Sequence, residues 1–309
     1  MKIGLHNHSP FSDGRQTVEQ IIEKAESEGV TDLAITDHES FGAVPYIREN
    51  NLYKRPSKIK IYPAIEIDFR HDGIANDVLI YGGNIEELSK LIPSLCPEHL
   101  QKINIEKIAN LHYGYTQLGF RLPPVEQLME IQAKSSQKPI VAFLVGLNKF
   151  KEYNDGMWAK HNAIERYQQV NFQKAFVTGK GAPYFRESKY KKPNLDELRQ
   201  AATKIDGKLF LAHPNRMKPH DMKHIVNYGL ANNIFDGIEV YYPNMTEQQF
   251  SDTHKLATDN GLLISGGTDS HTLSEPVGIA TTDKTQAGQN IYYVDECEFN
   301  WLKDIELIC

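Results

Sequence analysis

The chain has 309 residues, of which 40% are hydrophobic and 24% are charged. This composition is typical of globular proteins and excludes a disordered or collagen-like chain. The 34 Lys and Arg stand against 40 Asp and Glu, and the net charge of -6 argues against a broadly basic surface for extended duplex nucleic acid.

Cysteine content and apolar runs restrict the class of protein further. The three cysteines include no Cys-x-x-Cys pair, which argues against a disulfide framework and a cysteine-rich zinc site. The chain opens without a charged and apolar leader, and no apolar run approaches ~18 residues, so we expect a cytoplasmic protein with no membrane partner. At about 150 residues per domain, the length predicts two domains or one barrel with an insertion.

Short apolar runs predict seven strands. In chain order they are Ile3–Leu5, Leu33–Ile35, Ile59–Phe69, Val78–Tyr81, Leu209–Ala212, Ile238–Tyr242 and Leu262–Ser265. Helices are predicted from a capping box at Thr17–Gln20 to Gly29, over Asn194–Ile205 and over Thr246–Asn260. Alternating strands and helices favour βα units, with mostly parallel strands and both faces of the sheet covered.

The alternation lapses between about residues 97 and 193. This stretch contains an apolar segment, Ile140–Leu147, and helical patterns over Ile103–Leu118, Pro124–Ala133 and Trp158–Phe172. We interpret it as a mainly helical insertion between strands four and five of a barrel. The predicted domains are therefore residues 1–96 and 194–309 for the two parts of the barrel, and residues 97–193 for the insertion.

Two histidines follow the first predicted strand. His6 and His8 have i, i+2 spacing, which in an extended segment turns both imidazoles to one side, where they can reach one metal ion. Asp13 follows in a loop with Gly14. Taken alone, these features also describe two surface histidines and an ordinary turn.

Polar side chains also accompany the second and third strands. Thr36-Asp37-His38 ends the second run, at the face where barrel enzymes carry their sites, and Asp37 either orients a neighbouring ligand or caps a helix. Glu66 lies inside an otherwise apolar strand. A buried carboxylate is costly unless it is paired or bound to metal, and the alternative is an exposed edge position.

The later strands end in the same way. His213 closes the fifth run, where the alternative is a satisfied core histidine, and Asp269 and His271 share i, i+2 spacing after the seventh, where the alternative is a turn. The combined residues number four or five His, two Asp and a Glu, without a thiolate. Such a set suits a site of two or three divalent ions of Zn, Mn or Fe.

With these motifs in order, the chain resembles the PHP superfamily, named for polymerase and histidinol phosphatase, over residues 1–90 and about 195–280. The motifs are His6-x-His8 with Asp13, Thr36-Asp37-His38, Glu66, Leu211-Ala212-His213-Pro214 and Asp269-x-His271. The chain is most similar to the stand-alone phosphoesterases that act on nucleoside 3',5'-bisphosphates and short 5'-phosphorylated RNA. The inserted domain, the His213-Pro214-Asn215-Arg216 segment and the Asp236–Tyr241 lead-in carry that similarity.

The resemblance implies a distorted seven-stranded (β/α)7 barrel with a trinuclear centre. One metal would take His6, His8, Glu66 and Asp269, a second would share Glu66 and take His213, and a third would take Asp13, His38 and His271. The family usually supplies a further His to the second metal, and here Asp77 stands at that position. Asp77 is our candidate for it, with His71 as a lesser one, although Asp77 begins its apolar run rather than ending it.

The predicted function is hydrolysis of a phosphomonoester by a metal-bound hydroxide. Asp13, Asp269 or His271 would handle the proton. Arg216 would clamp the phosphate, and Lys180, Tyr184 and Arg186 in the insertion would hold a second phosphate or stack a base. The expected partner is a small phosphorylated substrate, a nucleotide or short oligonucleotide. The alternatives are a histidinol-phosphate phosphatase and a non-catalytic metal-binding module.

Overall fold

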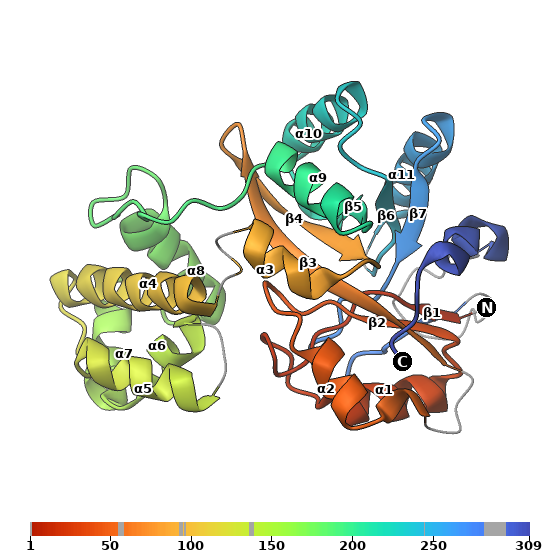
Figure 1. The fold of residues 1–309 in the computed structure, drawn as a ribbon. Coiled ribbons are helices and arrows are strands. Elements are labelled where there is room, and N and C mark those ends of the chain that lie inside the picture. Colours follow the sequence, from red (N-terminus) through yellow and green to blue (C-terminus); the bar gives the residue numbers. More distant parts are fainter. Residues whose placement is uncertain are drawn as a thin grey trace. The chain divides into compact units, whose positions relative to one another are not determined.

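Residues 2–54, 59–92, 95, 97–135, 139–243, 245–280 and 295–309 are described by the computed structural model. The chain divides into two units, Met1–Leu95 with Lys192–Cys309, and Cys96–Lys191. We refer to them as the barrel unit and the helical unit, and each is described by itself (Figure 1). Cys297 and Cys309 are exposed thiols, and Cys96 lies outside the described residues.

The strands of the barrel unit confirm the seven that the sequence predicts. They are β1 (Lys2–Gly4), β2 (Asp32–Ile35), β3 (Lys60–His71), β4 (Ile74–Tyr81), β5 (Lys208–Leu211), β6 (Gly237–Tyr241) and β7 (Leu263–Gly266). An eighth short strand, β8 (Ile279–Ala280), was not predicted, and it pairs with β1. The order across the sheet is β7-β6-β5-β4-β3-β2-β1-β8.

The sheet closes because the segments after β1 and β7 pair with each other. Leu5 N donates to Gly266 O at 3.2 Å, Asp269 N donates to His6 O at 3.0 Å, and His8 N donates to Ser270 O at 2.9 Å. These bonds join the two sides of the sheet and confirm the distorted barrel. They also place the two motifs with i, i+2 spacing next to each other.

The sequence analysis predicts mostly parallel strands, and the direction of β4 is an exception to that prediction. β4 pairs antiparallel with both β3 and β5, whereas β1–β2, β2–β3, β5–β6 and β6–β7 are parallel. The cause is the two-residue turn after β3, in which Asp72 and Gly73 both have positive φ, 49° and 82°. Asp-Gly suits a tight hairpin turn of this kind, and two residues cannot form the long crossover that parallel strands need.

Helices lie outside the strands of the barrel unit (Figure 1). They are α1 (Val18–Glu28), α2 (Ala43–Glu49), α3 (Leu88–Leu91), α9 (Leu195–Lys204), α10 (Pro219–Ala231) and α11 (Glu247–Asp259). The predicted caps are present, since Thr17 and Asn194 each form a capping box with the residue three positions later. The helix α1 buries Val18, Ile21, Ile22 and Ala25, the i, i+3, i+4, i+7 face of an amphipathic helix.

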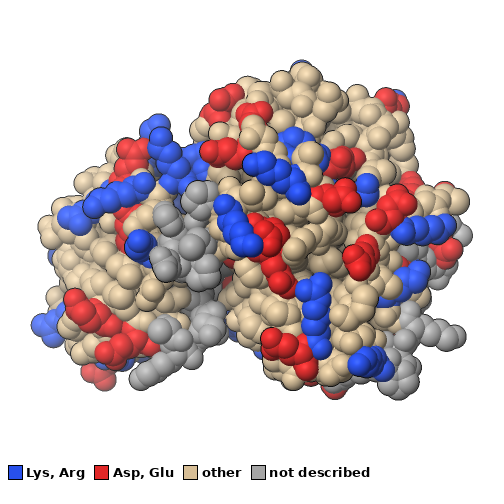
Figure 2. All heavy atoms as spheres, in the orientation of Figure 1, with Lys and Arg blue, Asp and Glu red and all other residues tan. Residues whose placement is uncertain are grey.

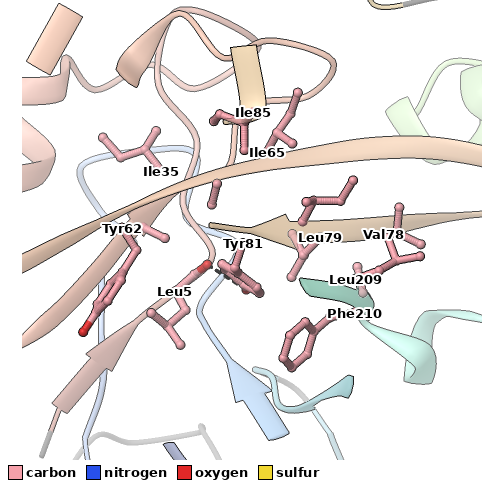
Figure 3. Packing of buried hydrophobic residues seen from close by; sticks show 14 of the residues in the cluster. Leu5, Ile35, Tyr62, Ile65, Val78, Leu79, Tyr81, Ile85, Leu209 and Phe210 are labelled. Carbon is pink, nitrogen blue, oxygen red and sulfur yellow. Dashed lines mark hydrogen bonds between the residues drawn. The ribbon is translucent and has the colours of Figure 1, made fainter. Parts of the chain in front are cut away.

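The apolar interior of the barrel is closely packed. Figure 3 shows the Tyr81 ring beside Leu5 and Phe210, and the Tyr81 and Phe210 rings meet edge to face at 5.2 Å. The buried Tyr81 hydroxyl donates to Leu5 O at 3.0 Å, so its polar atom is satisfied within the core. Burial of these side chains is the main contribution to the stability of the barrel.

The helical unit confirms the insertion between β4 and β5. Its helices are α4 (Pro97–Gln117), α5 (Val125–Ser135), α6 (Pro139–Asn148), α7 (Lys151–Lys160) and α8 (Arg166–Gln173). The single helix predicted over Trp158–Phe172 is wrong, because α7 ends at Lys160 and α8 begins at Arg166. Between them Asn162 has a φ of 53°, and Glu165 opens α8 with a capping box, so the local conformation breaks the helix.

The surface carries charges of both signs. On the face shown in Figure 2, acidic and basic side chains are interspersed over both units. Among the residues that the structure describes, no helix is both long and apolar enough to cross a membrane.

Candidate metal centre

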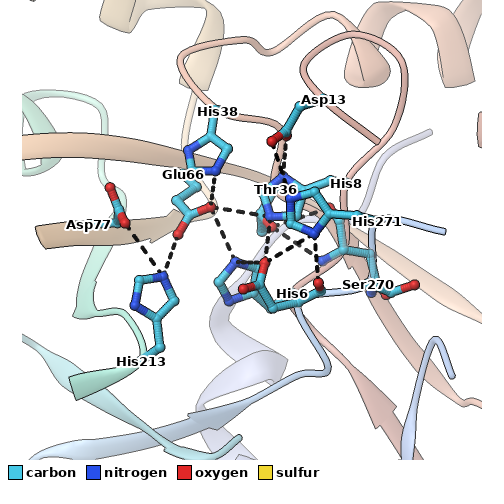
Figure 4. A network of polar contacts seen from close by, with 12 residues as sticks. His6, His8, Asp13, Thr36, His38, Glu66, Asp77, His213, Ser270 and His271 are labelled. Carbon is cyan, nitrogen blue, oxygen red and sulfur yellow. Dashed lines mark hydrogen bonds and ion pairs between the residues drawn. The ribbon is translucent and has the colours of Figure 1, made fainter. Parts of the chain in front are cut away.

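The predicted metal ligands gather at one end of the barrel (Figure 4). The first, second, fifth and seventh strands each supply side chains just beyond their carboxyl ends, and β3 and β4 supply theirs from within. The residues are His6, His8, His38, Glu66, Asp77, His213, Asp269 and His271, with Asp13 from the loop after β1. Asp269 has a φ of 53° and His213 a φ of 27°, uncommon values that mark a strained backbone at these two positions.

One group of four fits a divalent ion closely. His6 Nε2 lies 3.3 Å from Glu66 Oε2 and 3.4 Å from Asp269 Oδ1. His8 Nε2 lies 3.2 Å and 3.0 Å from the same two oxygens. Ligands held about 2.1 Å from a tetrahedral ion stand about 3.4 Å apart, so this spacing leaves room for one ion.

A second group shares His8 and contains Asp13, His38 and His271. His271 Nε2 lies 3.3 Å from Asp13 Oδ2, and His8 Nδ1 lies 3.7 Å from Asp13 Oδ1. The His8 ring stacks between those of His38 and His271, at centroid distances of 4.8 Å and 4.2 Å. All four ligand atoms fall within 4.8 Å of one another, so the three residues that the first group does not use, Asp13, His38 and His271, could hold a second ion.

Asp77 reaches the cluster because β4 runs antiparallel to its neighbours. His213 Nε2 lies 2.9 Å from Glu66 Oε1 and 3.5 Å from Asp77 Oδ2. Asp77 also forms a possible ligand group with His38 and Glu66. The first half of an antiparallel strand lies at the end where its parallel neighbours finish, and this explains how a residue that begins its apolar run joins the site.

His71 lies apart from this cluster, near the β3–β4 turn. Its buried ring packs against that of Tyr228 with centroids 4.0 Å apart, and its Nε2 is 3.8 Å from Asp72 Oδ2. Asp77 and His71 are the two candidates for the position where the family usually has a further His. The structure brings Asp77, and not His71, to His213.

The buried carboxylates favour positive charge at the centre. Burial opposes a charge on His8, yet its contacts with Asp269 and Glu66 raise the pKa of its imidazole to about 9. The pKa of Glu66 is lowered well below its usual value, because burial is outweighed by the charges of His6 and His38. At the Asp77 edge, burial and the neighbouring Asp68 and Glu66 raise the pKa of the Asp77 carboxyl to about 9.

Ligand atoms at the centre are left without ordinary hydrogen bonds. His6 Nε2, His8 Nε2 and Glu66 Oε2 are buried and make no hydrogen bond among the described residues. Leaving buried polar atoms unsatisfied costs about 1–3 kcal/mol each, so such atoms call for an explanation. A divalent ion supplies one, because imidazole nitrogen and carboxylate oxygen are the donors that Zn, Mn and Fe accept.

Glu239 is a residue of this site that the sequence analysis did not assign. It is fully buried in β6, with Oε1 2.9 Å from His6 Nδ1 and with Oε2 accepting from His213 N at 2.8 Å. The argument that singled out Glu66, a carboxylate inside an apolar run, applies equally to Glu239 between Ile238 and Val240.

Asp37 organises the loop that carries Asp13. It is buried and accepts hydrogen bonds from Ser9 N at 2.7 Å, Ser9 Oγ at 2.6 Å and Ser12 Oγ at 2.6 Å. Burial raises the pKa of the Asp37 carboxyl, although these hydrogen bonds act against the rise. Asp37 therefore supports a neighbouring loop, and it does not cap a helix in this arrangement.

Arg216 stands at the edge of the first group. Its Nη1 donates to Asp269 Oδ2 at 3.0 Å, and the Tyr242 hydroxyl donates to the same oxygen at 2.9 Å. The Arg216 side chain is 56% exposed, so it is accessible to a ligand entering from solvent. A second cation lies near Asp77. The Lys192 ammonium pairs with Asp68, which faces Asp77 across the β3–β4 hairpin.

The remaining predicted substrate-binding residues belong to the helical unit. Lys180 and Arg186 are exposed and Tyr184 is half-buried, and the Arg186 guanidinium lies 3.4 Å above the centre of the Tyr113 ring. Their assignment to substrate binding stays a prediction.

Comparison with known proteins identifies one family and two relatives. The model of the PHP domain family matches residues 4–257. A phosphoribosyl 1,2-cyclic phosphate 1,2-diphosphodiesterase of Eggerthella lenta is 25% identical over 271 residues, which are 86% of this chain and 93% of the relative. A 5'-3' exoribonuclease Rnm of Salmonella typhimurium is 33% identical over 82 residues, 26% of this chain and 27% of that protein.

Solved structures share the fold. An amidohydrolase from Chromobacterium violaceum has a TM-score of 0.61 at 18% identity, over 88% of each chain. A protein from Bifidobacterium adolescentis described as a metal-dependent phosphoesterase has a TM-score of 0.61 at 17% identity, over 98% of this chain and 94% of that one.

Proposed function

Because the chain belongs to the PHP domain family and is a metal-dependent phosphoesterase, we propose that it hydrolyses a phosphate ester of a small ribose carrying a second phosphate. The observation that carries this proposal is the pair of overlapping ligand groups that share His8, with the exposed Arg216 at their edge. A site with several cations beside a guanidinium suits a substrate with two anionic groups.

Bound divalent ions would lower the pKa of water and neutralise the charge on the phosphate oxygens. The chain would hold them through the buried imidazoles of His6 and His8 and the carboxylates of Glu66 and Asp269. Arg216 would bind a phosphate oxygen, because a guanidinium can donate two parallel hydrogen bonds to phosphate.

Asp13, Asp269 and His271 are the candidates for moving a proton, and their contacts differ. Asp269 has both oxygens engaged, Oδ1 by the two imidazoles and Oδ2 by Arg216 and Tyr242. Asp13 and His271 lie at the outer edge, with side chains 18% and 29% exposed. We therefore propose that the proton reaches the departing oxygen from solvent at this outer edge, beside Asp13 and His271.

Two substrates of this class have support. A nucleoside 3',5'-bisphosphate or a short 5'-phosphorylated oligonucleotide is supported by the His213-Pro214-Asn215-Arg216 segment and by the short match to the exoribonuclease. A phosphoribosyl 1,2-cyclic phosphate is supported by the relative that spans nearly the whole chain. Both substrates carry two phosphates on one ribose, so the same arrangement of cations serves either.

Phosphate release tests the proposal. Each ribose substrate is incubated with the protein and Mn²⁺, beside histidinol phosphate, with a chelator control and the His8→Ala variant. We expect release that the chelator and the variant abolish, from at least one ribose substrate. For the cyclic diester, opening of the ring is followed by chromatography. Hydrolysis of histidinol phosphate alone would contradict the ribose assignment, and hydrolysis that resists chelation would contradict the metal centre.

A further inference from the structure

Glu239 joins two ligand motifs that are more than 200 positions apart in the sequence. Its Oε1 lies 2.9 Å from Nδ1 of His6, after β1, and its Oε2 accepts the backbone N–H of His213, after β5, at 2.8 Å. All three residues are at most 2% exposed. In this dry environment, each of these hydrogen bonds is strong and costly to lose.

The hydrogen bond to His6 determines which ring nitrogen faces the centre as a lone pair. An ionised carboxylate only accepts hydrogen bonds, so the proton of His6 stays on Nδ1. When an ion is bound, the lone pair of Nε2 would point at it, in the space shared with Glu66 Oε2 and Asp269 Oδ1, which lie 3.3 Å and 3.4 Å from Nε2. A metal ion requires this tautomer, because it binds the unprotonated nitrogen.

The second hydrogen bond holds the backbone where His213 turns into the site. His213 has a φ of 27° and a ψ of 59°, outside the common regions for a residue with a side chain. Such a conformation persists only where the surroundings enforce it. The bond from His213 N to Glu239 supplies one constraint, and it leaves Nε2 of His213 directed at Glu66 Oε1 at 2.9 Å.

We propose that Glu239 is the positioning residue of the metal centre, because it sets the tautomer of His6 and fixes the backbone of His213 at the same time. This inference rests on the proposed metal centre and adds a residue that does not itself touch the ion. One carboxylate thereby orients His6, a member of the first group, and His213, which contacts Glu66 and Asp77.

Glutamine has nearly the same shape as glutamate but cannot perform both roles. Its carbonyl oxygen can accept from His213 N only if its amide NH₂ faces His6 Nδ1. The NH₂ then donates to Nδ1 and moves the ring proton to Nε2, where it blocks the metal. In the flipped orientation, the NH₂ meets the N–H of His213, and two donors face each other.

Metal binding by Glu239→Gln tests the proposal without any substrate. Zn²⁺ affinity and stoichiometry are measured by calorimetry and metal analysis on chelator-treated wild type, Glu239→Gln and a control, Glu298→Gln. Glu298 is a matched control because it also accepts two hydrogen bonds, one of them from a histidine. Its partners are His254 Nε2 at 2.6 Å and the hydroxyl of Tyr241 at 2.6 Å, and Tyr241 lies in the same strand as Glu239. We expect Glu239→Gln to bind at least one ion about 10–100-fold more weakly, and the control to match wild type.

The tautomer itself is read on the wild-type protein, so the test survives if the variant fails to fold. In Zn²⁺-loaded protein with ¹⁵N-labelled histidine, long-range nitrogen–proton NMR spectra should show His6 protonated at Nδ1 and bound through Nε2. A proton on Nε2, or wild-type affinity in a folded Glu239→Gln variant, would overturn the role of Glu239. Wild-type protein that binds no divalent ion would instead contradict the proposed function.

Discussion

The two units of the chain bury polar side chains in opposite ways. The core of the helical unit is aromatic, with Tyr115, Phe120 and Trp158 in contact, and its one buried polar residue among those described, Asn154, has both polar atoms of its amide bonded to backbone groups. In the barrel unit, three buried atoms of the centre, His6 Nε2, His8 Nε2 and Glu66 Oε2, make no hydrogen bond among the described residues. Because such atoms are costly, their concentration at one end of the barrel indicates a ligand, whereas the amide of Asn154 is satisfied within the core of the helical unit.

The largest effect is expected at the barrel centre. His8→Ala and Asp269→Ala should each lower kcat/KM by about 10³-fold or more, because each removes a ligand that stabilises charge in the transition state. Circular dichroism should stay unchanged, and His220→Ala, at an exposed position on α10, should behave as wild type. Substantial activity in either ligand variant would contradict the assignment of the site.

A core truncation in the helical unit should affect stability and not the metal centre. Trp158 is buried among aromatic rings, so Trp158→Ala should lower the free energy of unfolding by about 3–5 kcal/mol, while metal stoichiometry of the folded protein is retained. Urea titration followed by circular dichroism measures the first quantity, because Trp158→Ala leaves Trp301 of the barrel unit as the only tryptophan. Tyr167→Ala, which removes an aromatic side chain that is 65% exposed, is the control with little effect expected. Loss of metal from folded Trp158→Ala would show that the two units do not divide these roles.

The role of Arg216 can be separated from that of Asp269. Arg216→Ala should raise KM about 10–100-fold if the guanidinium binds substrate phosphate, since charge-assisted hydrogen bonds contribute about 1.5–3 kcal/mol. Tyr242→Phe removes the other donor to Asp269 Oδ2 without removing a charge. If both variants lower kcat alike and leave KM unchanged, Arg216 positions Asp269 and does not bind the phosphate.

A smaller effect is expected for Asp77 in the metal-free protein. Its pKa is raised from 3.8 to about 9, so the folded state keeps a proton that the unfolded state releases, and stability falls as pH rises between these values. Asp77→Asn removes this penalty and should stabilise the metal-free protein at pH 7. Metal binding should weaken in the same variant.

Thermal unfolding with a chelator, from pH 4 to pH 9, checks this sign. The difference in Tm between wild type and Asp77→Asn should widen as pH rises. Asp72→Asn, at an exposed position of the same hairpin, should follow the wild-type curve. Parallel curves for wild type and Asp77→Asn would show that Asp77 titrates normally.

Local patterns in the sequence were sufficient for much of the barrel and of its centre. Apolar runs and capping boxes predict strands and helices because they depend on neighbours a few positions away, and side chains placed after parallel strands must meet at one end of a barrel. His6, His8 and His38 could therefore be named from the sequence. The Asp72-Gly73 pair is also a local signal, since Asp-Gly favours a tight turn and hence the antiparallel hairpin of β3 and β4.

Other features depend on contacts between distant segments. The sequence shows Asp77 at the wrong end of its run for a parallel strand, and only the antiparallel pairing of β4 carries it to His213. Likewise, the sequence shows Glu239 as a carboxylate in a strand, whereas its contacts with His6 and His213 exist only once β1, β5 and β6 assemble. The sequence by itself determined which residues stand at the ends of the strands, because that is a local property. The tertiary structure decided which of them share an ion and what orients them, because strand direction and register bring together side chains that the chain keeps far apart.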